Sequence, residues 1–227
     1  MVDRTDVGNA SELQYFGKMT ASISHEIKNV MAIINESAGL LEDYSLMAEK
    51  GMAIDPERLK VVSDRVTMQI RRADRITKNL NNLAHSVDEF HKSIDLKETL
   101  ALAVGLSGRF ADMRSIRLEF QPPSDVPTVI TSSFHLLNLI WRVLDFAMGM
   151  SGTEKMIGLT YDSDAESVKI RFTGLAAAPN APEAIFPTAG EAVLLRILGA
   201  TIQQDAKGGV ITLVLPKDVR QQVKTDC

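Results

Sequence analysis

Apolar residues recur over the first ninety positions at alternating steps of four and three, and this spacing limits the fold more than any other feature. The first series contains Ile23, Ile27, Val30, Ile34, Leu41 and Tyr44, with Ser37 filling the missing place. Such a repeat is typical of the a/d seam of a coiled-coil-like helix. It predicts a long helix from about Ala10 to about Glu49.

A second helix is predicted directly after the first. Gly51 is suited to ending a helix, and Asp55 followed by Pro56 is a typical helix start, with Asp55 as the N-cap. A second seam follows, interrupted once by Gln69. Its members are Leu59, Val62, Val66, Ala73, Ile76, Leu80, Leu83, Val87 and Phe90. The short connection makes the helices antiparallel, and a hairpin cannot cover both of its seams. We therefore expect a homodimer that completes a four-helix bundle.

The pattern changes from about Ser93 to short strands that alternate with helices. Strands are expected at about 94–96, 116–120, 156–161, 168–172 and 210–215, and helices at about 97–111, 134–150 and 191–201. Residues 173–190 are rich in Ala, Pro and Gly, which predicts an irregular loop. The expected fold is α+β. A long antiparallel helical hairpin in domain 1–92 is followed by an α/β sandwich in domain 93–227, with its sheet covered on one face.

Composition excludes several classes of function. The chain of 227 residues has a net charge of −4, which argues against nucleic-acid binding. The single cysteine, Cys227, allows no disulfide within the chain, and no histidine pair has metal-ligand spacing. The polar first ten residues predict no signal peptide. The longest apolar segment, 136–150, contains two charges and is too short to span a bilayer. We expect a cytoplasmic protein with no membrane partner.

The run Ser24-His25-Glu26-Ile27-Lys28-Asn29 carries the most chemistry in the chain. Counted from Ile27 as position a, His25 falls at position f, opposite the seam, so its imidazole should point to water. Asn29 follows four residues later and shares that face of the helix. An exposed histidine on such a face can accept a large group, such as a phosphoryl group.

This motif resembles the phosphoacceptor box of bacterial two-component histidine kinases, and the resemblance extends over nearly the whole chain. The second half resembles the family's ATP-binding domain. The resemblance implies that His25 is the nucleophile, that Glu26 is its orienting base, and that Asn29 orients a water for hydrolysis of aspartyl phosphate. The implied partners are response-regulator receiver domains. The receiver would bring its own Mg²⁺, so no cofactor is expected on this chain.

The same resemblance predicts that ATP binding is lost. Arg142 and Phe146 fall where the family has two asparagines, and a phenylalanine offers no oxygen to Mg²⁺. Gly174 falls on the aspartate that recognises adenine, while Ala176 and Ala178 fall on glycines. A helical hairpin with a degenerate kinase domain resembles the bundle-type histidine phosphotransferases.

Four functions follow from this pattern. The leading hypothesis is a phosphorelay protein that exchanges phosphoryl groups between His25 and receiver aspartates. A receiver phosphatase that depends on Asn29 is the second. The third is a non-enzymatic pseudokinase scaffold that binds receivers. An ATP-dependent histidine kinase with a divergent pocket is the fourth.

Overall fold

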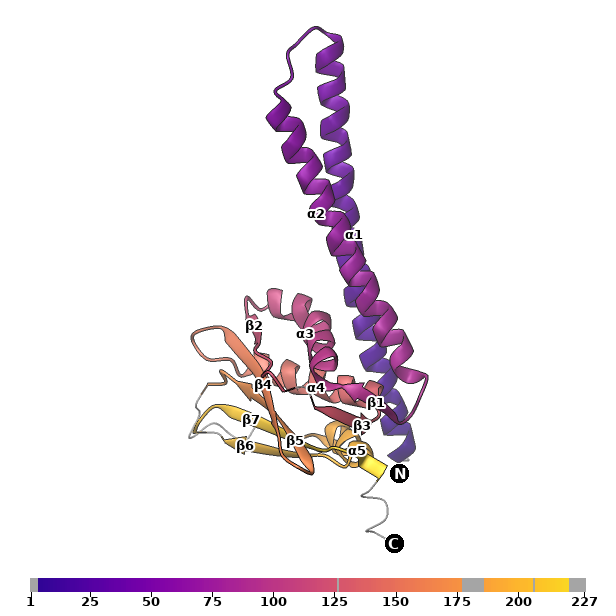
Figure 1. Cartoon of the computed structure of the whole chain (residues 1–227), viewed down its shortest axis with the longest axis vertical. Helices are drawn as coiled ribbons and strands as arrows, with labels where there is room; N and C mark the ends of the chain where they lie inside the picture. Colours follow the sequence, from indigo (N-terminus) through magenta and orange to yellow (C-terminus); the bar gives the residue numbers. More distant parts are fainter. Residues whose placement is uncertain (1–3, 126, 177–185, 206, 221–227) are drawn as a thin grey trace. The chain divides into compact units, whose positions relative to one another are not determined.

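The chain folds into two compact units. The computed structural model describes residues 4–125, 127–176, 186–205 and 207–220. One unit is a helical hairpin of residues Lys18–Asn82 (Figure 1). The other combines the α/β domain, from Leu83 onward, with the first turns of the long first helix, up to Gly17.

The hairpin consists of α1 (Arg4–Glu49) and α2 (Pro56–Ala84). Helix α1 begins earlier than predicted and ends where predicted, before Gly51, whose φ of +75° is a left-handed conformation that favours glycine. Helix α2 begins at Pro56 as predicted. The Asp55 carboxylate accepts the backbone N–H of Glu57 at 3.0 Å, which satisfies a free donor of the first turn.

Buried residues recur seven positions apart on both helices of the hairpin. They include Ile23, Val30 and Ser37 on α1, and Val62, Gln69 and Ile76 on α2. The other half of the predicted seam remains accessible, since Ile27 and Ile34 are partly exposed and Leu41 is 41% exposed. Two helices bury only the strip between them, so the hairpin leaves a second apolar stripe uncovered.

Helix α2 ends earlier than the sequence pattern predicted. A 3₁₀ turn, η1 (His85–Val87), follows it directly, and the Ser86 hydroxyl donates to the Leu83 carbonyl at 2.6 Å. Val87 and Phe90, which were predicted to extend the seam, are 56% and 57% exposed. The hydroxyl takes a carbonyl that the last helical turn leaves free, which helps to end the helix.

The α/β unit contains a five-stranded sheet in the order β2-β4-β5-β7-β6. Its strands are β2 (Arg117–Phe120), β4 (Met156–Ser163), β5 (Ser167–Thr173), β6 (Thr201–Asp205) and β7 (Val210–Pro216). Strands β2 and β4 are parallel, and the other pairs are antiparallel. In β5, Val168, Ile170 and Phe172 are completely buried and alternate with partly exposed residues. One face of the sheet is therefore covered.

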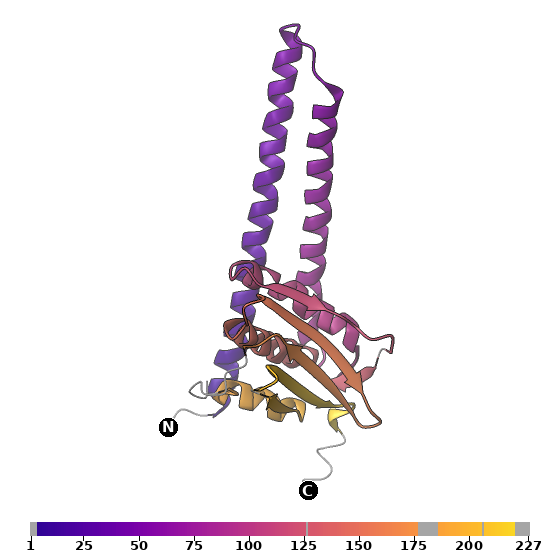
Figure 2. The same cartoon turned by 90° about the vertical axis from the view of Figure 1, so that its left-hand side faces the viewer.

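The unit also contains three helices, α3 (Leu96–Asp112), α4 (Ser133–Gly149) and α5 (Ala189–Leu198). Helix α3 packs against β2 and α4 packs against β5, and α4 also packs against both other helices (Figure 2). A small antiparallel pair, β1 (Lys92–Asp95) with β3 (Thr128–Thr131), completes the unit. The predicted fold class, a helical hairpin followed by an α/β sandwich, is confirmed. Strands β3 and β6 had not been predicted.

The first turns of α1 pack against the start of α4 within this unit. The Tyr15 ring is 1% exposed, and its centroid lies 5.7 Å from that of Phe134 and 5.6 Å from that of Trp141. Burial raises the pKa of the Tyr15 phenol above its usual value. Beside it, Glu12 Oε1 lies 3.0 Å from His135 Nε2. These contacts explain why the start of α1 belongs to the α/β unit.

Candidate functional site

His25 is exposed on α1, as its heptad position predicted. Its imidazole makes no hydrogen bond or ion pair with any residue that the structure describes. Both ring nitrogens are therefore accessible to a reacting group. Asn29 lies one turn further along α1 and is also exposed. The helix brings these two side chains to one face, since residues four apart are neighbours on a helix surface.

Glu26 lies against the second helix rather than in open solvent. Its Oε2 atom is 3.6 Å from Nη2 of Arg72, and its side chain is 19% exposed. Neighbouring residues on a helix do not face one another, so Glu26 and His25 point in different directions. The position of Arg72, three residues after the seam residue Gln69, is the sequence signal for its place at the helix–helix contact.

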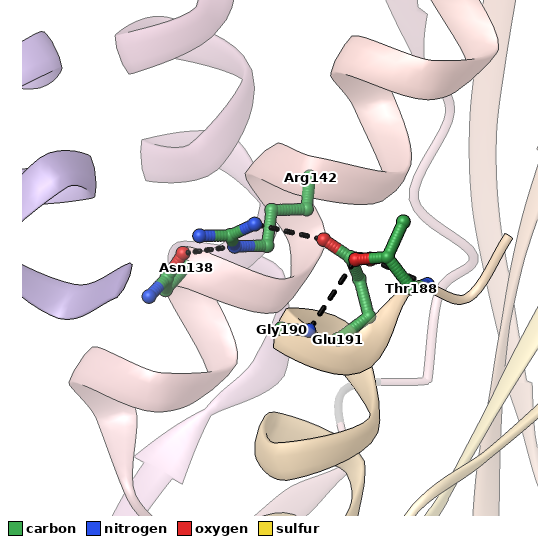
Figure 3. A network of polar contacts seen from close by, with 5 residues as sticks. All are labelled: Asn138, Arg142, Thr188, Gly190 and Glu191. Carbon is green, nitrogen blue, oxygen red and sulfur yellow. Dashed lines mark hydrogen bonds and ion pairs between the residues drawn. The ribbon is translucent and has the colours of Figure 1, made fainter. Parts of the chain in front are cut away.

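In the α/β unit, Arg142 joins α4 to α5. Its Nη1 atom donates to Glu191 Oε1 at 2.8 Å, and its Nε donates to Asn138 Oδ1 at 3.0 Å (Figure 3). The Arg142 and Glu191 side chains are only 15% and 5% exposed. The arginine is thus engaged from two sides by residues of its own unit.

The Glu191 carboxylate also accepts hydrogen bonds from Thr188, in addition to the one from Arg142. Both the backbone N–H and the hydroxyl of Thr188 donate to its Oε2 atom, the backbone bond at 2.8 Å, which forms a capping box at the start of α5. Burial by itself would raise the pKa of the Glu191 carboxyl. The hydrogen bonds from Thr188 and Arg142 outweigh burial, so this pKa lies below its usual value.

Phe146 and Gly174, which stand where the resemblance expects nucleotide-binding residues, also make close contacts within the α/β unit. The Phe146 ring stacks on Phe186, with centroids 4.4 Å apart and planes inclined by 14°. Gly174 has a φ of +90°, and a Cβ atom there would lie 2.1 Å from the Met156 carbonyl oxygen. No side chain fits at position 174 in this backbone. Residues 177–185, which include Ala178, and Cys227 lie outside the described residues.

No group of three or more His, Cys, Asp or Glu side chains in the described ranges is placed to hold a metal ion. Over the same ranges, no helix is both long enough and apolar enough to cross a membrane.

Comparison with known proteins gives matches of fold. The chain matches no family model and no curated protein. The histidine kinase AdeS of Acinetobacter baumannii is 14% identical, over 85% of this chain and 98% of its own, with a TM-score of 0.47. A histidine kinase from Burkholderia phymatum STM815 is 13% identical, over 89% of this chain and 97% of its own, with a TM-score of 0.48.

A third match is the histidine kinase ThkA in complex with the response regulator protein TrrA. It is 20% identical, over 90% of this chain and 63% of that one, with a TM-score of 0.44. At these identities and TM-scores the likeness concerns the fold and assigns neither a family nor an activity.

Proposed function

We propose that this protein is a histidine phosphotransferase of a two-component phosphorelay. In this proposal His25 accepts a phosphoryl group from the aspartate of one receiver domain and passes it to another. The observation that carries the proposal is the exposed imidazole of His25, which has no partner among the described residues and lies on the same helical face as Asn29. A nucleophile needs such a free lone pair and room for a large donor.

The chemistry requires little from the chain beyond position and charge. A lone pair of the neutral imidazole forms the N–P bond while the O–P bond of the aspartyl phosphate breaks, and the aspartate leaves as a carboxylate. The transition state is loose and in line, so alignment and charge neutralisation supply most of the catalysis. The ring nitrogen that does not attack keeps its proton. In the reverse direction the N–P bond breaks and the next receiver's carboxylate takes the phosphoryl group.

In this mechanism Glu26 holds the proton-bearing nitrogen of His25 and so fixes the tautomer. The carboxylate would first have to leave Arg72. Their ion pair has a distance of 3.6 Å and is partly exposed. Ion pairs of this kind contribute less than about 1 kcal/mol to stability. Moving the Glu26 carboxylate from Arg72 to His25 therefore costs little free energy.

The contacts of the second unit support a function that needs no nucleotide. Arg142 is bound to Glu191, Phe146 is stacked on Phe186, and Gly174 has no room for a side chain. These residues stand where the resemblance expects the nucleotide-binding asparagines and aspartate, and their contacts within the unit support the proposed loss of ATP binding. We therefore expect ATP with Mg²⁺ to leave the melting temperature unchanged. A rise in that temperature, or labelling by ATP, would favour an ATP-dependent kinase instead.

We further propose that the active form is a homodimer. The uncovered stripe contains Ile27, Ile34 and Leu41 on α1, and Leu59, Val66 and Ile70 on α2. On each helix these residues share one face, so two hairpins can bury them against each other as a four-helix bundle. His25 lies away from this stripe and stays accessible in such a dimer.

The test is phosphoryl transfer from a panel of phosphorylated receivers to the protein, without nucleotide. The wild-type protein should gain an acid-labile label, and His25→Ala should gain none. His85→Ala is a matched control, because His85 is also an exposed histidine, with its side chain 76% exposed. A label on His25→Ala equal to that of the wild type would overturn the assignment of His25.

A receiver phosphatase is the second candidate, favoured by the exposed amide of Asn29 beside His25. Under that function Asn29→Ala stops the release of phosphate from the receiver, whereas His25→Ala retains part of it. Receiver binding without transfer or phosphate release, and indifferent to His25→Ala, would indicate a scaffold.

A further inference from the structure

A group of cationic residues on α2 is not used by the proposed mechanism. Residues 71–78 contain four cations, Arg71, Arg72, Arg75 and Lys78, and one acid, Asp74. This concentration is local, since the whole chain has a net charge of −4. Arg71, Arg75 and Lys78 form no ion pair within the described part of the chain, and Arg71 and Arg75 are exposed. Among these four cations, Arg72 alone has an acidic partner within the described residues, which is Glu26.

Two ion pairs between the helices show that these cations are level with His25. Arg72 is opposite Glu26, and Arg65 is opposite Glu36 at 2.7 Å. Because the helices are antiparallel, Arg75 lies about 4.5 Å beyond Arg72, toward the N-terminal side of Glu26. Arg71 lies just before Arg72. The level of His25 therefore falls between Arg71 and Arg75.

The cations also lie on the same side of the hairpin as His25. Arg71, Arg75 and Lys78 are separated by four and three residues, so they share one face of α2. The apolar stripe, with Ile70 on α2 and Ile27 on α1, occupies one side of both helices. The strip between the helices is buried, so the faces of Arg75 and His25 are left on the opposite side. Figure 2 shows the two helices of the hairpin running side by side.

We infer that this cationic face, defined as Arg71, Arg75 and Lys78, is the docking surface for the receiver domain that exchanges its phosphoryl group with His25. The inference rests on the proposed function. A receiver that presents an aspartyl phosphate brings a negative charge of nearly two beside the acidic groups that hold its Mg²⁺. Met68, which is 61% exposed and follows the same face one turn before Arg72, adds an apolar contact. Charge complementarity of this kind mainly accelerates association and selects the partner.

The experiment compares Arg75→Glu with Lys60→Glu. Both replace an exposed cation of α2 by an acid, so the net charge changes equally, but Lys60 lies about 18 Å further along the helix from Arg72. The second-order rate constant of phosphoryl transfer from the receiver should fall by about tenfold in Arg75→Glu at low salt and stay unchanged in Lys60→Glu. The difference should shrink as salt is added. Equal rates in the two variants would overturn the docking surface.

A small donor separates this inference from the proposed function. Phosphoramidate can label His25 without docking, so both variants should react with it at the wild-type rate. Slower phosphoramidate labelling of Arg75→Glu would show an effect on the imidazole itself and would overturn a pure docking role. If no receiver labels the wild-type protein, the proposed function fails. The docking surface is then judged by calorimetric binding of the receiver: weaker binding by Arg75→Glu alone supports it, and equal or absent binding overturns it.

Discussion

Glu26 and Arg72 are paired across the hairpin, with Oε2 and Nη2 3.6 Å apart. This pair directs the carboxylate next to His25 away from the imidazole. In the structure His25 is therefore exposed without a partner among the described residues, whereas Glu26 contacts Arg72. Glu26 reaches the imidazole only after it leaves the arginine.

We expect Glu26→Gln to lower the rate of phosphoryl transfer by at least about tenfold, because the amide holds the imidazole tautomer less well than a carboxylate. Arg72→Gln should keep most of the transfer and change the free energy of unfolding by less than about 1 kcal/mol, since the pair is partly exposed. Single-turnover transfer and urea unfolding measure both effects. If Arg72→Gln slowed phosphoramidate labelling as much as Glu26→Gln, the arginine rather than the carboxylate would be the positioning group.

The pair of Arg142 and Glu191 should stabilise the α/β unit, because both side chains are nearly buried. Arg142→Ala leaves the Glu191 carboxylate buried without its partner, which should lower the free energy of unfolding by about 3 kcal/mol. The double variant Arg142→Met/Glu191→Leu should lose much less, because it leaves no unpaired charge. Urea unfolding measures these differences. Equal losses in the single and double variants would contradict this account.

The same pair predicts a dependence on pH. The folded-state pKa of Glu191 is lowered, so the carboxylate stabilises the fold above the ordinary glutamate pKa of about 4.3. That contribution disappears as the pH falls through the folded-state pKa. The difference in unfolding free energy between the wild-type protein and Glu191→Gln should therefore be largest at neutral pH and vanish in acid. A difference that does not change with pH would show that the ionised carboxylate contributes nothing.

The sequence predicted the helices well because the signals were local. The heptad spacing and the Asp55-Pro56 start depend only on neighbouring residues, and the structure begins α2 at Pro56. Strands β3 and β6 were not predicted because their local sequence signals are weak. Strand β3 has only four residues, and four of the five residues of β6 are exposed, so neither shows the apolar alternation of a longer buried strand.

For the candidate site too, the features set by local sequence were predictable and the long-range contacts were not. The exposure of His25 followed from its heptad position, which is a local property. The contacts of Glu26 with Arg72 and of Arg142 with Glu191 join residues 46 and 49 positions apart (72 − 26 and 191 − 142), and no local pattern indicates them. Which half of each seam is buried was equally out of reach, because it depends on how the partner helix is rotated.

Tyr15 should matter for stability through its ring and not through its hydroxyl. The hydroxyl is buried without a hydrogen-bond partner among the described residues. Tyr15→Phe removes this unsatisfied group and should raise the free energy of unfolding by about 1 kcal/mol. Tyr15→Ala removes the ring from between Phe134 and Trp141 and should lower it by about 3 kcal/mol. Destabilisation by Tyr15→Phe would show that the hydroxyl has a partner, such as a bound water.

The uncovered stripe of the hairpin predicts which apolar residues hold the homodimer together. Ile70 and Val61 both lie on α2 and are 49% and 58% exposed, but they face opposite sides of the hairpin. Ile70→Asp places a charge within the proposed four-helix bundle and loses the apolar burial of the isoleucine, about 2 kcal/mol in each subunit. Light scattering should then give the monomer mass of 24.9 kDa. Val61→Asp should keep twice that mass, since the side of Val61 remains in solvent. If Val61→Asp separated the subunits while Ile70→Asp did not, the copies would associate through the side of His25. The cationic face would then be covered in the dimer.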